Sequence, residues 1–372
     1  MIYPSLANDN LLSVLRLIRT QNIGAITFFT LIRKFGSATK ALEALPELAR
    51  RGGGKPLVAY AKDLAEKEIA ATEKFGARMI VYGAADYPEL LLNIPDPPPI
   101  ITVRGNAEIW RKKPLVAIVG ARNASAAGCQ FAQMLAGDLG RGGAVVVSGL
   151  ARGIDSFAHK GSLATGTVAV IAGGIDNVYP PENAKLYQQI FEQGAVIAEQ
   201  AYGALPFAGS FPSRNRIIAG MSFGTLVVEA SPKSGSLITA RLALENNREV
   251  FAVPGSPLDP RSKGCNQLIR QGATMAESAI DVLYAIRAPR QFNFAETPKE
   301  IFAAVPDENQ LDNLREIVVQ KLGVQPVSVD ELIEQCDAPV GSVQTVLLEL
   351  ELAGRLRRSG GNKVSLIFAR LC

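Results

Sequence analysis

Between residues 115 and 255 the sequence alternates short apolar runs, rich in β-branched residues, with longer amphipathic segments. The runs are LVAIVG, AVVVSG, VAVIAGG, AVIAE, TLVVEA and EVFAVPG. Such alternation is typical of parallel strands, because each parallel connection needs a crossover segment, usually a helix, and the helices bury both faces of the sheet. The sequence therefore predicts an α/β core in which a parallel sheet is covered by helices on both faces.

Four of these runs end directly in glycine. In parallel sheets ligands gather beyond the carboxyl ends of the strands, where glycine lets the backbone approach a ligand closely. We therefore expect one rim of the sheet to carry a site rich in glycine, hydroxyl and basic groups, which is a combination suited to phosphate. The residues expected there are Gly120, Ala121, Arg122, Gly149, Arg152, Gly173, Gly174, Lys233, Ser234, Gly235 and Ser236.

The segment FPSRNRIIAG adds a pair of arginines to this rim. Arg214 and Arg216 flank Asn215 at the start of a predicted helix, where unpaired backbone N–H groups already favour anions. Residues two apart on a helix diverge by about 200°, so only one of the two arginines is expected to face the rim. We expect Arg122 to contact phosphate rather than to form a structural salt bridge, whereas Arg152 could equally pair with a helix carboxylate.

Groups that could catalyse a reaction are sparse. His159 is the single histidine of the chain and follows Asp155 by four residues, so the two could form an acid/base pair on one helix face. The interpretation we favour is structural: Asp155 caps its helix and His159 forms a local hydrogen bond. No reactive cysteine context and no recognisable carboxylate pair accompanies them. The site is predicted to hold its ligand rather than to cleave it.

Composition excludes several other classes. Lys and Arg number 39 against 35 Asp and Glu, so a polyanion site must be local rather than spread over the surface. The four cysteines form no CxxC pair, which argues against a metal site and a disulfide framework and fits a reducing cytoplasm. Neither a signal sequence nor an apolar run of membrane-spanning length is found, so we expect a cytoplasmic chain without a membrane span. GGGKP lacks the hydroxyl residue of a phosphate loop, and GARNASAAG lacks GxGxxG, so no ATP, NAD or other cofactor is expected.

A chain of 372 residues is expected to hold two or three domains. We predict a helical domain over 1–75, the α/β core over 76–287, a linker over 288–310 and a winged-helix domain over 311–372. The helical domain could present backbone amides to DNA as a helix-hairpin-helix does, although a packing or dimerising bundle is the favoured interpretation. In the last domain, a cluster of basic residues could grip DNA or form a solvated edge or a partner surface, and the last two are favoured. That cluster is Arg355, Arg357, Arg358 and Lys363.

Taken in order, several motifs resemble those of the DNA-processing protein A family (DprA, also called Smf). They are DYPELLLNIPDPPPIITVRGN, VGARNAS, SGLARGIDSFAH, IAGGIDNVYPPEN, FPSRNRIIAG, TLVVEASPKSGSLITARLALENNREVFAVPGS and GCNQLIRQGA. The resemblance implies an extended Rossmann-like core that dimerises, binds single-stranded DNA and loads the RecA recombinase during natural transformation. It also implies a SAM-like helical first domain and a winged-helix last domain. Arg122 matches the arginine that the family places against DNA phosphate, and the glycines of SGLARG and AGG match the lining of the same pocket.

Two other functions remain open at this stage. A nucleotide phosphoribohydrolase with a related sheet is one, because Gly224, Thr225 and Glu229 loosely echo the motif PGGxGTxxE. A transcription factor that binds duplex DNA through the winged helix is the other. The favoured prediction is a non-enzymatic recombination mediator that binds single-stranded DNA.

Overall fold

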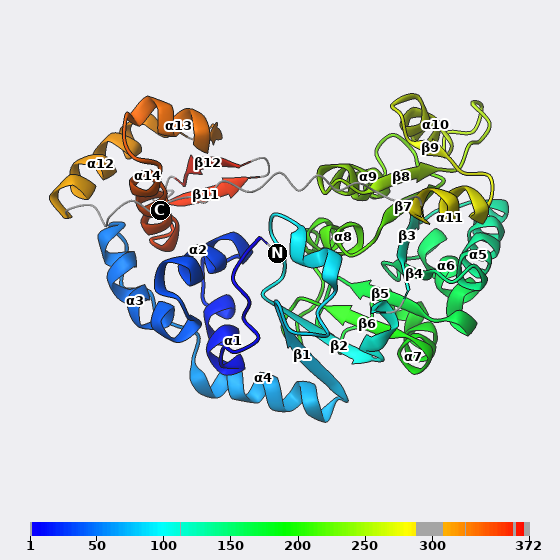
Figure 1. Ribbon diagram of the computed structural model, residues 1–372, viewed down its shortest axis with the longest axis horizontal. Coiled ribbons are helices and arrows are strands. Elements are labelled where there is room, and N and C mark those ends of the chain that lie inside the picture. The colour runs from blue at the N-terminus through cyan, green and yellow to red at the C-terminus, as the bar shows by residue number, and fades with distance from the viewer. Residues whose placement is uncertain (1, 112, 288–307, 324, 360–361, 368–372) are drawn as a thin grey trace. The chain divides into compact units, whose positions relative to one another are not determined.

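The computed structural model describes residues 2–111, 113–287, 308–323, 325–359 and 362–367 (Figure 1). Contacts between Cα atoms divide the chain into two compact units. The first joins the residues up to Asn8 to the segment from Asp63 onward and contains the α/β core; the second joins Asp9–Lys62 to the described residues after 307. Residues 2–8 thus belong with the core rather than with the helical segment that follows them, since the amide of Leu6 donates to the carbonyl of Tyr82.

A nine-stranded sheet forms the centre of the first unit, in the order β1-β2-β6-β5-β4-β3-β7-β8-β9. The seven strands from β6 to β9 along this order run parallel, and β1 and β2 are antiparallel to their neighbours. All six strands expected from the apolar runs are present, so the prediction of a parallel sheet is confirmed. The strand bounds are β1 Ala77–Val81, β2 Ile100–Gly105, β3 Leu115–Gly120, β4 Val145–Ser148, β5 Thr167–Ile171, β6 Ala195–Ala198, β7 Gly224–Val228, β8 Glu249–Ala252 and β9 Thr274–Met275.

Helices cover both faces of this sheet, as the alternation predicts (Figure 1). Alternate side chains of β3, Val116 and Ile118, pack in one core cluster with α5, α6 and α11, and α7 packs on β5 and β6. On the other face, α8 and α9 contact β5, β3, β7 and β8. The helix bounds are α4 Lys62–Lys74, α5 Ala126–Arg141, α6 Ile154–Ser162, α7 Ala184–Gln193, α8 Ser210–Gly220, α9 Gly235–Glu245, α10 Lys263–Arg270 and α11 Ala279–Arg287, with short 3₁₀ helices at Glu89–Asn93, Ala107–Trp110, Leu163–Thr165 and Pro181–Asn183.

The proline-rich segment IPDPPPIITVRGN contributes a strand to the sheet. Its second half is β2, which pairs with both β1 and β6. The prolines stop at Pro99, so every residue from Ile100 onward can donate to the ladder, and Ile101 and Val103 are buried. The antiparallel β1–β2 pair extends the parallel sheet at this end.

The second unit combines the helices of the chain's first part with the winged-helix domain. Its first three helices are α1 Leu11–Arg19, α2 Ala25–Phe35 and α3 Ala38–Arg51. The winged helix comprises α12 Glu308–Lys321, β10 Val327–Ser328, α13 Val329–Cys336, α14 Val340–Leu352, β11 Leu356–Ser359 and β12 Lys363–Leu366. Its three strands form a sheet in the order β10-β12-β11, and one apolar cluster joins the three helices to it. The predicted helical and winged-helix folds are both confirmed, whereas most of the predicted linker lies outside the described residues.

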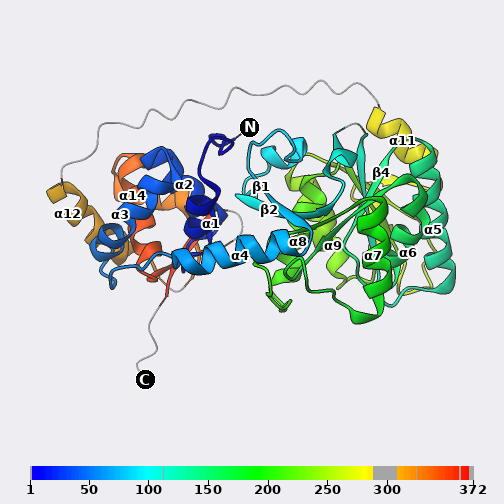
Figure 2. The ribbon, with the colours of Figure 1, turned by 90° about the horizontal axis from the view of Figure 1, so that it is seen from below.

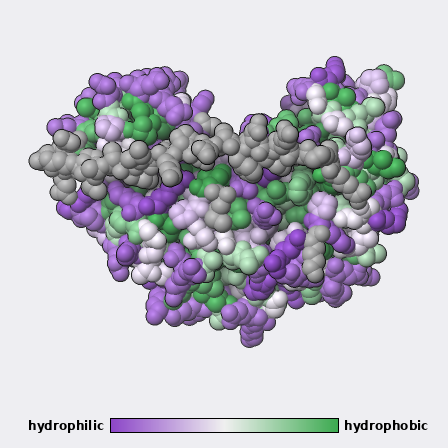
Figure 3. Space-filling model, viewed as in Figure 1, coloured by the Kyte–Doolittle hydropathy of each residue, from purple (hydrophilic) through white to green (hydrophobic). Residues whose placement is uncertain are grey.

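No helix among the described residues is long and apolar enough to cross a lipid bilayer. Figure 3 shows hydrophilic residues over much of the visible face, with hydrophobic residues in smaller separate areas. Figure 2 gives the view at right angles, in which β1 and β2 lie on one side of the first unit and α5 on the other.

Candidate nucleic-acid interface

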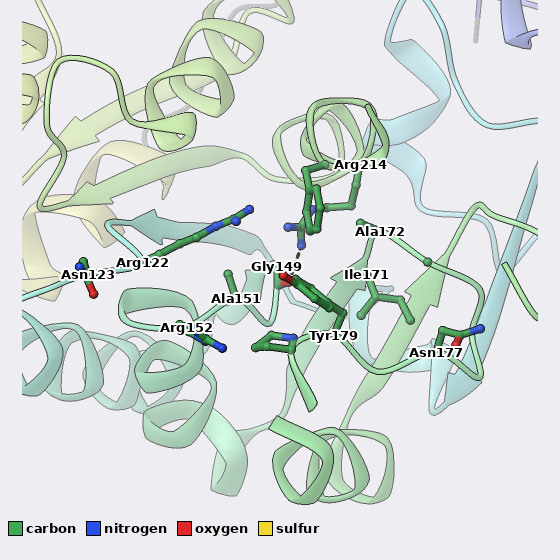
Figure 4. A pocket seen from close by; sticks show the side chains of 13 residues that line it. Arg122, Asn123, Gly149, Ala151, Arg152, Ile171, Ala172, Asn177, Tyr179 and Arg214 are labelled. Atoms are coloured by element: carbon green, nitrogen blue, oxygen red, sulfur yellow. Dashed lines mark hydrogen bonds between the residues drawn. The ribbon is translucent and has the colours of Figure 1, made fainter. Parts of the chain in front are cut away.

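A pocket opens where β3, β4 and β5 end, at the rim predicted from the sequence (Figure 4). Its volume is about 140 Å³, enough for a few water-sized groups but too small to enclose a nucleotide. Basic, aromatic and backbone groups share its wall. The lining residues are Arg122, Asn123, Gly149, Ala151, Arg152, Ile171, Ala172, Gly173, Asn177, Tyr179, Pro180, Phe211 and Arg214.

Arg214 reaches this pocket from α8 and is buried. Its Nη1 donates to the backbone carbonyls of Gly149 and Val170, at the ends of β4 and β5. A Cβ at position 149 would lie 2.0 Å from that nitrogen, so glycine is what lets the guanidinium pass. Burial lowers the pKa of Arg214 to about 10 although the nearby carboxylate of Asp155 opposes this, and Arg214 therefore stays cationic at neutral pH.

The loop after β4 is held in a strained conformation. Leu150 is buried with φ of 56°, in the left-handed region that bulky side chains rarely adopt. Asp155 Oδ2 accepts from the amides on either side of it, those of Gly149 at 3.1 Å and Ala151 at 3.4 Å. Asn183 Nδ2 donates to the carbonyl of Leu150 at 2.9 Å. Strain that is held on three sides in this way is common at functional sites, because it fixes the backbone before a ligand arrives.

Arg122 stands in the loop between β3 and α5 and is exposed. Its guanidinium carbon lies 4.9 Å from the ring centroid of Phe211, close enough for a cation–π contact. Phe211 in turn packs against Tyr179, with the ring centroids 5.6 Å apart. No carboxylate pairs with Arg122 in the part of the chain that the structure describes, so its charge is available to an anion.

The two aromatic residues were missed in the sequence, because aromatic residues make up only 6% of the chain and neither belongs to a stacking motif. Their one signal is position: Tyr179 follows the strand that ends in the AGG glycines, and Phe211 begins the segment that carries Arg214.

Arg152 lines the pocket but already has a partner. Its Nε forms an ion pair with Glu182, and 64% of the Arg152 side chain and 49% of the Glu182 side chain are exposed. Because exposed pairs contribute little, typically about 0–1 kcal/mol, Arg152 can exchange this carboxylate for another anion at small expense. The ion pair that the sequence left open for Arg152 is therefore present.

The other residues predicted from the rim do not line the pocket. Gly120 lets β3 pack against its neighbours, since a Cβ there would lie 1.9 Å from the Val228 carbonyl, and the Ala121 amide donates to the carbonyl of Glu229. A Cβ at Gly174 would lie 2.3 Å from the carbonyl of Ala201, so this glycine packs against the adjacent turn. Asn215 is half-buried in α8. At the end of β7, next to β3 in the sheet, lie Lys233, Ser234, Gly235 and Ser236, where Ser234 caps α9.

Arg216 points away from Arg214 and lies in a buried ion-pair cluster. Its Nε donates to Asp96 at 3.0 Å and its Nη2 to Glu199 at 2.5 Å. Burial alone would lower its pKa, but the two carboxylates outweigh burial and raise the pKa above its ordinary value. The structure therefore brings only Arg214 of this pair to the pocket.

Asp155 and His159 lie on α6, but each bonds to another group. His159 Nδ1 lies 2.9 Å from the hydroxyl of Thr167, and burial lowers the pKa of His159 to about 3, so the ring is neutral. Burial raises the pKa of Asp155, with the cation of Arg214 opposing it. Asp155 fixes the preceding loop rather than capping α6, whose N-cap is Gly153. No cluster of metal-ligating side chains occurs among the described residues.

Comparison with protein families identifies the chain. The model of DNA recombination-mediator protein A matches residues 78–287, more than half of the sequence. The chain belongs to this family, the DprA family. Two further family models match other parts of the chain: the DprA-like N-terminal HHH domain over residues 8–71 and the DprA winged helix domain over 302–362.

Curated relatives and solved structures agree. The chain is 34% identical to Protein Smf of Synechocystis over 74% of its own length and 77% of that protein. It is 36% identical to Protein Smf of Escherichia coli over 81% of its length and 80% of that protein. The X-ray structure of DprA from Streptococcus pneumoniae superposes with a TM-score of 0.62 at 32% identity, covering 74% of this chain and 98% of that one. A structure of DprA from Helicobacter pylori, described for its single-stranded DNA binding mode, gives a TM-score of 0.52 at 28% identity, covering 56% of this chain and 95% of that one.

Proposed function

We propose that this protein binds single-stranded DNA at the pocket and acts as a recombination mediator without catalysing a reaction. One observation carries the proposal: Arg122, an exposed arginine that pairs with no carboxylate of the described residues, lies over the ring of Phe211 at the mouth of a pocket whose wall is built on the buried cation of Arg214. Single-strand sites combine cations for the backbone with aromatic faces for the bases.

In this proposal each part of the pocket has its own task. Arg122 binds a phosphate, and the exposed face of the Tyr179–Phe211 pair accepts a base. Arg214 and the loop that Asp155 holds supply a fixed positive potential, because their positions are set before DNA arrives. Gly149 and Gly173 line the pocket, and the missing Cβ of Gly149 leaves room for the Arg214 guanidinium in its wall. The single-stranded DNA binding described for the Helicobacter pylori relative supports this assignment.

The strand leaves the pocket along the same rim of the sheet. Because β7 is the neighbour of β3, the turn after β7 continues this rim. There Lys233 is exposed, and a Cβ at Gly235 would meet nothing within 4 Å, so the backbone is open to a ligand. We assign a backbone contact to Lys233, Ser234, Gly235 and Ser236.

The state of the titratable groups supports the proposed absence of catalysis. His159 is buried and neutral, and the carboxylate of Asp155 is occupied by two backbone amides. Glu229, the residue that a phosphoribohydrolase would use, accepts from the amide of Ser125 at 2.8 Å and also from its hydroxyl, so it serves to fix the start of α5. No histidine, carboxylate, lysine or cysteine is among the described residues that line the pocket.

The biological role we infer is the handling of incoming DNA in the cytoplasm and the loading of the RecA recombinase onto it. The match to a recombination-mediator family and the similarity to a DNA processing protein, DprA of Streptococcus pneumoniae, support this role. We also infer a homodimer of the core. Large apolar side chains are exposed on β9 and α11, with 48% of Met275, 74% of Ile280 and 81% of Tyr284 accessible. Two sites in one particle would bind long strands more tightly than short ones.

Charge reversal tests the binding site. Arg122→Glu should weaken single-strand binding by about 1–3 kcal/mol, because a charge-assisted hydrogen bond is removed and repulsion is added. The matched control is Arg141→Glu, which makes the same charge change at the far end of α5, about 24 Å away along a helix of 16 residues. Fluorescence anisotropy with a labelled oligonucleotide measures both. Equal affinities of the two folded variants would overturn the assignment.

Two further assays address the role. A nucleotide and nucleic-acid cleavage assay on the same preparation should detect no turnover; turnover that disappears in His159→Ala or Asp155→Asn would overturn the non-catalytic proposal. Strand exchange by RecA on DNA coated with single-strand-binding protein should start sooner when this protein is present. An unchanged lag with wild-type protein would remove the loading function, whatever the result for binding.

A further inference from the structure

The winged-helix domain docks on the chain's own helical domain. In a winged helix the third helix, here α14, is the element that enters a DNA groove. In this protein α14 is buried on two sides. One side, with Val343, Val346 and Leu350, faces its own domain core, and residues on the other side, Leu348, Glu349 and Leu352, are buried as well.

The second side of α14 packs against α3 and the GGG turn that follows it. A Cβ at Gly52 would lie 2.0 Å from the carbonyl oxygen of Glu349, and a Cβ at Gly54 would lie 2.8 Å from the Cα of Ala353. Both separations are shorter than the 3.0 Å below which real Cβ atoms are essentially never found, so this turn admits α14 only because it consists of glycines. Packing against α14 therefore explains the run of glycines in GGGKP, which is not a phosphate loop.

Polar contacts between the two domains surround this glycine turn. Arg355 Nη1 donates to the carbonyl of Gly52 at 3.3 Å, and Asn22 Nδ2 donates to the carbonyl of Leu352 at 3.4 Å. Both acceptors are backbone groups, and the second is one of the last carbonyls of α14, which a helix leaves without an internal partner. The helical domain thus supplies part of the C-terminal cap of α14.

Charge on α14 suits the helical domain and not DNA. The sequence of α14, VGSVQTVLLELEL, contains two glutamates and neither Lys nor Arg. The side chain of Glu349 is 1% exposed and pairs with Arg315 of α12. Its charge also acts on Lys34, where burial lowers the pKa and Glu349 opposes that effect. A helix that reads DNA needs hydrogen-bonding groups for the base edges and cationic side chains for the phosphates. The charged side chains of α14 are glutamates, which the phosphates would repel.

We propose that the winged-helix domain is an intrachain docking module whose partner is the surface formed by α3 and Gly52–Gly54, and that α14 does not read duplex DNA. The domain ties the chain after residue 307 to the helical domain near its start. This proposal rests on contacts within the second unit and is independent of the single-strand site.

Hydrogen exchange of the full-length protein tests the docking. Gly52→Val places side-chain atoms where the Glu349 carbonyl lies, so amides at the end of α14 and at the end of α3 should together exchange about tenfold faster or more. Gly341→Val is the matched control. Gly341 lies on α14 itself, and a Cβ there would meet nothing within 4 Å. If Gly52→Val does not fold, Arg355→Ala should raise the same amides' exchange to a smaller extent. Unchanged protection of α14 in either folded variant would overturn the proposal.

A titration with duplex DNA distinguishes two possibilities: α14 serves only for docking, or docking covers a helix that can bind duplex DNA. The wild-type protein and Gly52→Val are each titrated against a labelled duplex under one salt condition. Affinities within about twofold of each other support a module whose only use of this face is docking. A marked gain of duplex affinity in Gly52→Val would show that α14 reads DNA when released, and would overturn the proposal.

Discussion

The guanidinium of Arg214 lies directly against the backbone of Gly149, where a single Cβ would stand 2.0 Å from its Nη1. The carbonyl of Gly149 accepts from the same nitrogen, and the amide of Gly149 donates to Asp155. The backbone of Gly149 therefore links the buried guanidinium of Arg214 to the buried carboxylate of Asp155, which partly balances its charge. The shape of the pocket depends on this contact.

Gly149→Ala should accordingly damage both the fold and the site. The added methyl must displace a buried guanidinium that bonds two carbonyls, and overpacking of this kind costs about 1–3 kcal/mol. We expect a lower midpoint of urea unfolding and weaker single-strand binding. Gly235→Ala on the same rim is the control, since its Cβ meets nothing within 4 Å and it should unfold as the wild type does. Wild-type stability in Gly149→Ala would mean that Arg214 does not occupy this position.

Arg216 should matter for stability rather than for the pocket. Arg216→Leu leaves the carboxylates of Asp96 and Glu199 without their buried partner, and breaking such a pair costs about 3–5 kcal/mol. Trp110, the one tryptophan of the chain, is buried in the first unit and reports its unfolding by fluorescence. A destabilisation below about 1 kcal/mol would show that the cluster contributes little.

His159 predicts an acid-sensitive core. Its pKa is lowered to about 3 by burial, whereas in the unfolded chain it lies near 6.5. Because the folded pKa is depressed, the unfolded state takes up the proton first. Stability is therefore complete above pH 6.5 and falls as the pH drops toward 3. Between pH 7.5 and pH 5 the decrease is about 2 kcal/mol, since each pH unit below 6.5 contributes about 1.4 kcal/mol.

Urea unfolding followed by Trp110 at the two pH values measures this decrease. No other histidine contributes, because the chain has one. His159→Gln keeps a side chain able to hydrogen-bond Thr167 but has no group that titrates in this pH range. The stability of this variant should therefore change far less between the same two pH values. A variant whose stability falls as much as that of the wild type would assign the effect to carboxyl groups instead.

Much of the core and of the site's location was predictable from the sequence. The six apolar runs became strands because each is short and β-branched, and parallel strands end on one rim whatever their order. That rim holds Arg122, Gly149, Arg152 and Gly173, which came from three separate strand ends. Position relative to a strand end was enough to place them.

What the sequence could not decide depends on contacts between distant residues. Helical spacing separates Arg214 from Arg216, but only the acids at positions 96 and 199 determine which of the two turns away. The use of Gly120 for sheet packing depends on β7, more than 100 residues later in the chain. The docking of α14 on Gly52 joins residues about 300 positions apart, and neither segment alone carries a sign of it.

The salt dependence of binding decides between the pocket and the wing as the main single-strand site. Of the wing's basic residues, Arg355 contacts the Gly52 carbonyl and Arg358 pairs with Glu351, which leaves Arg357 and Lys363 exposed. Removing the cation from one phosphate of a single strand lowers the slope of log affinity against log salt by about 0.7. Arg122→Ala should therefore reduce the slope by about 0.7, whereas the double variant Arg357→Ala with Lys363→Ala should reduce it by less than that. Anisotropy titrations across a salt series give the three slopes. A drop of about 1.4 in the double variant, with none in Arg122→Ala, would make the wing the principal DNA-binding element and would move the proposed site away from the pocket.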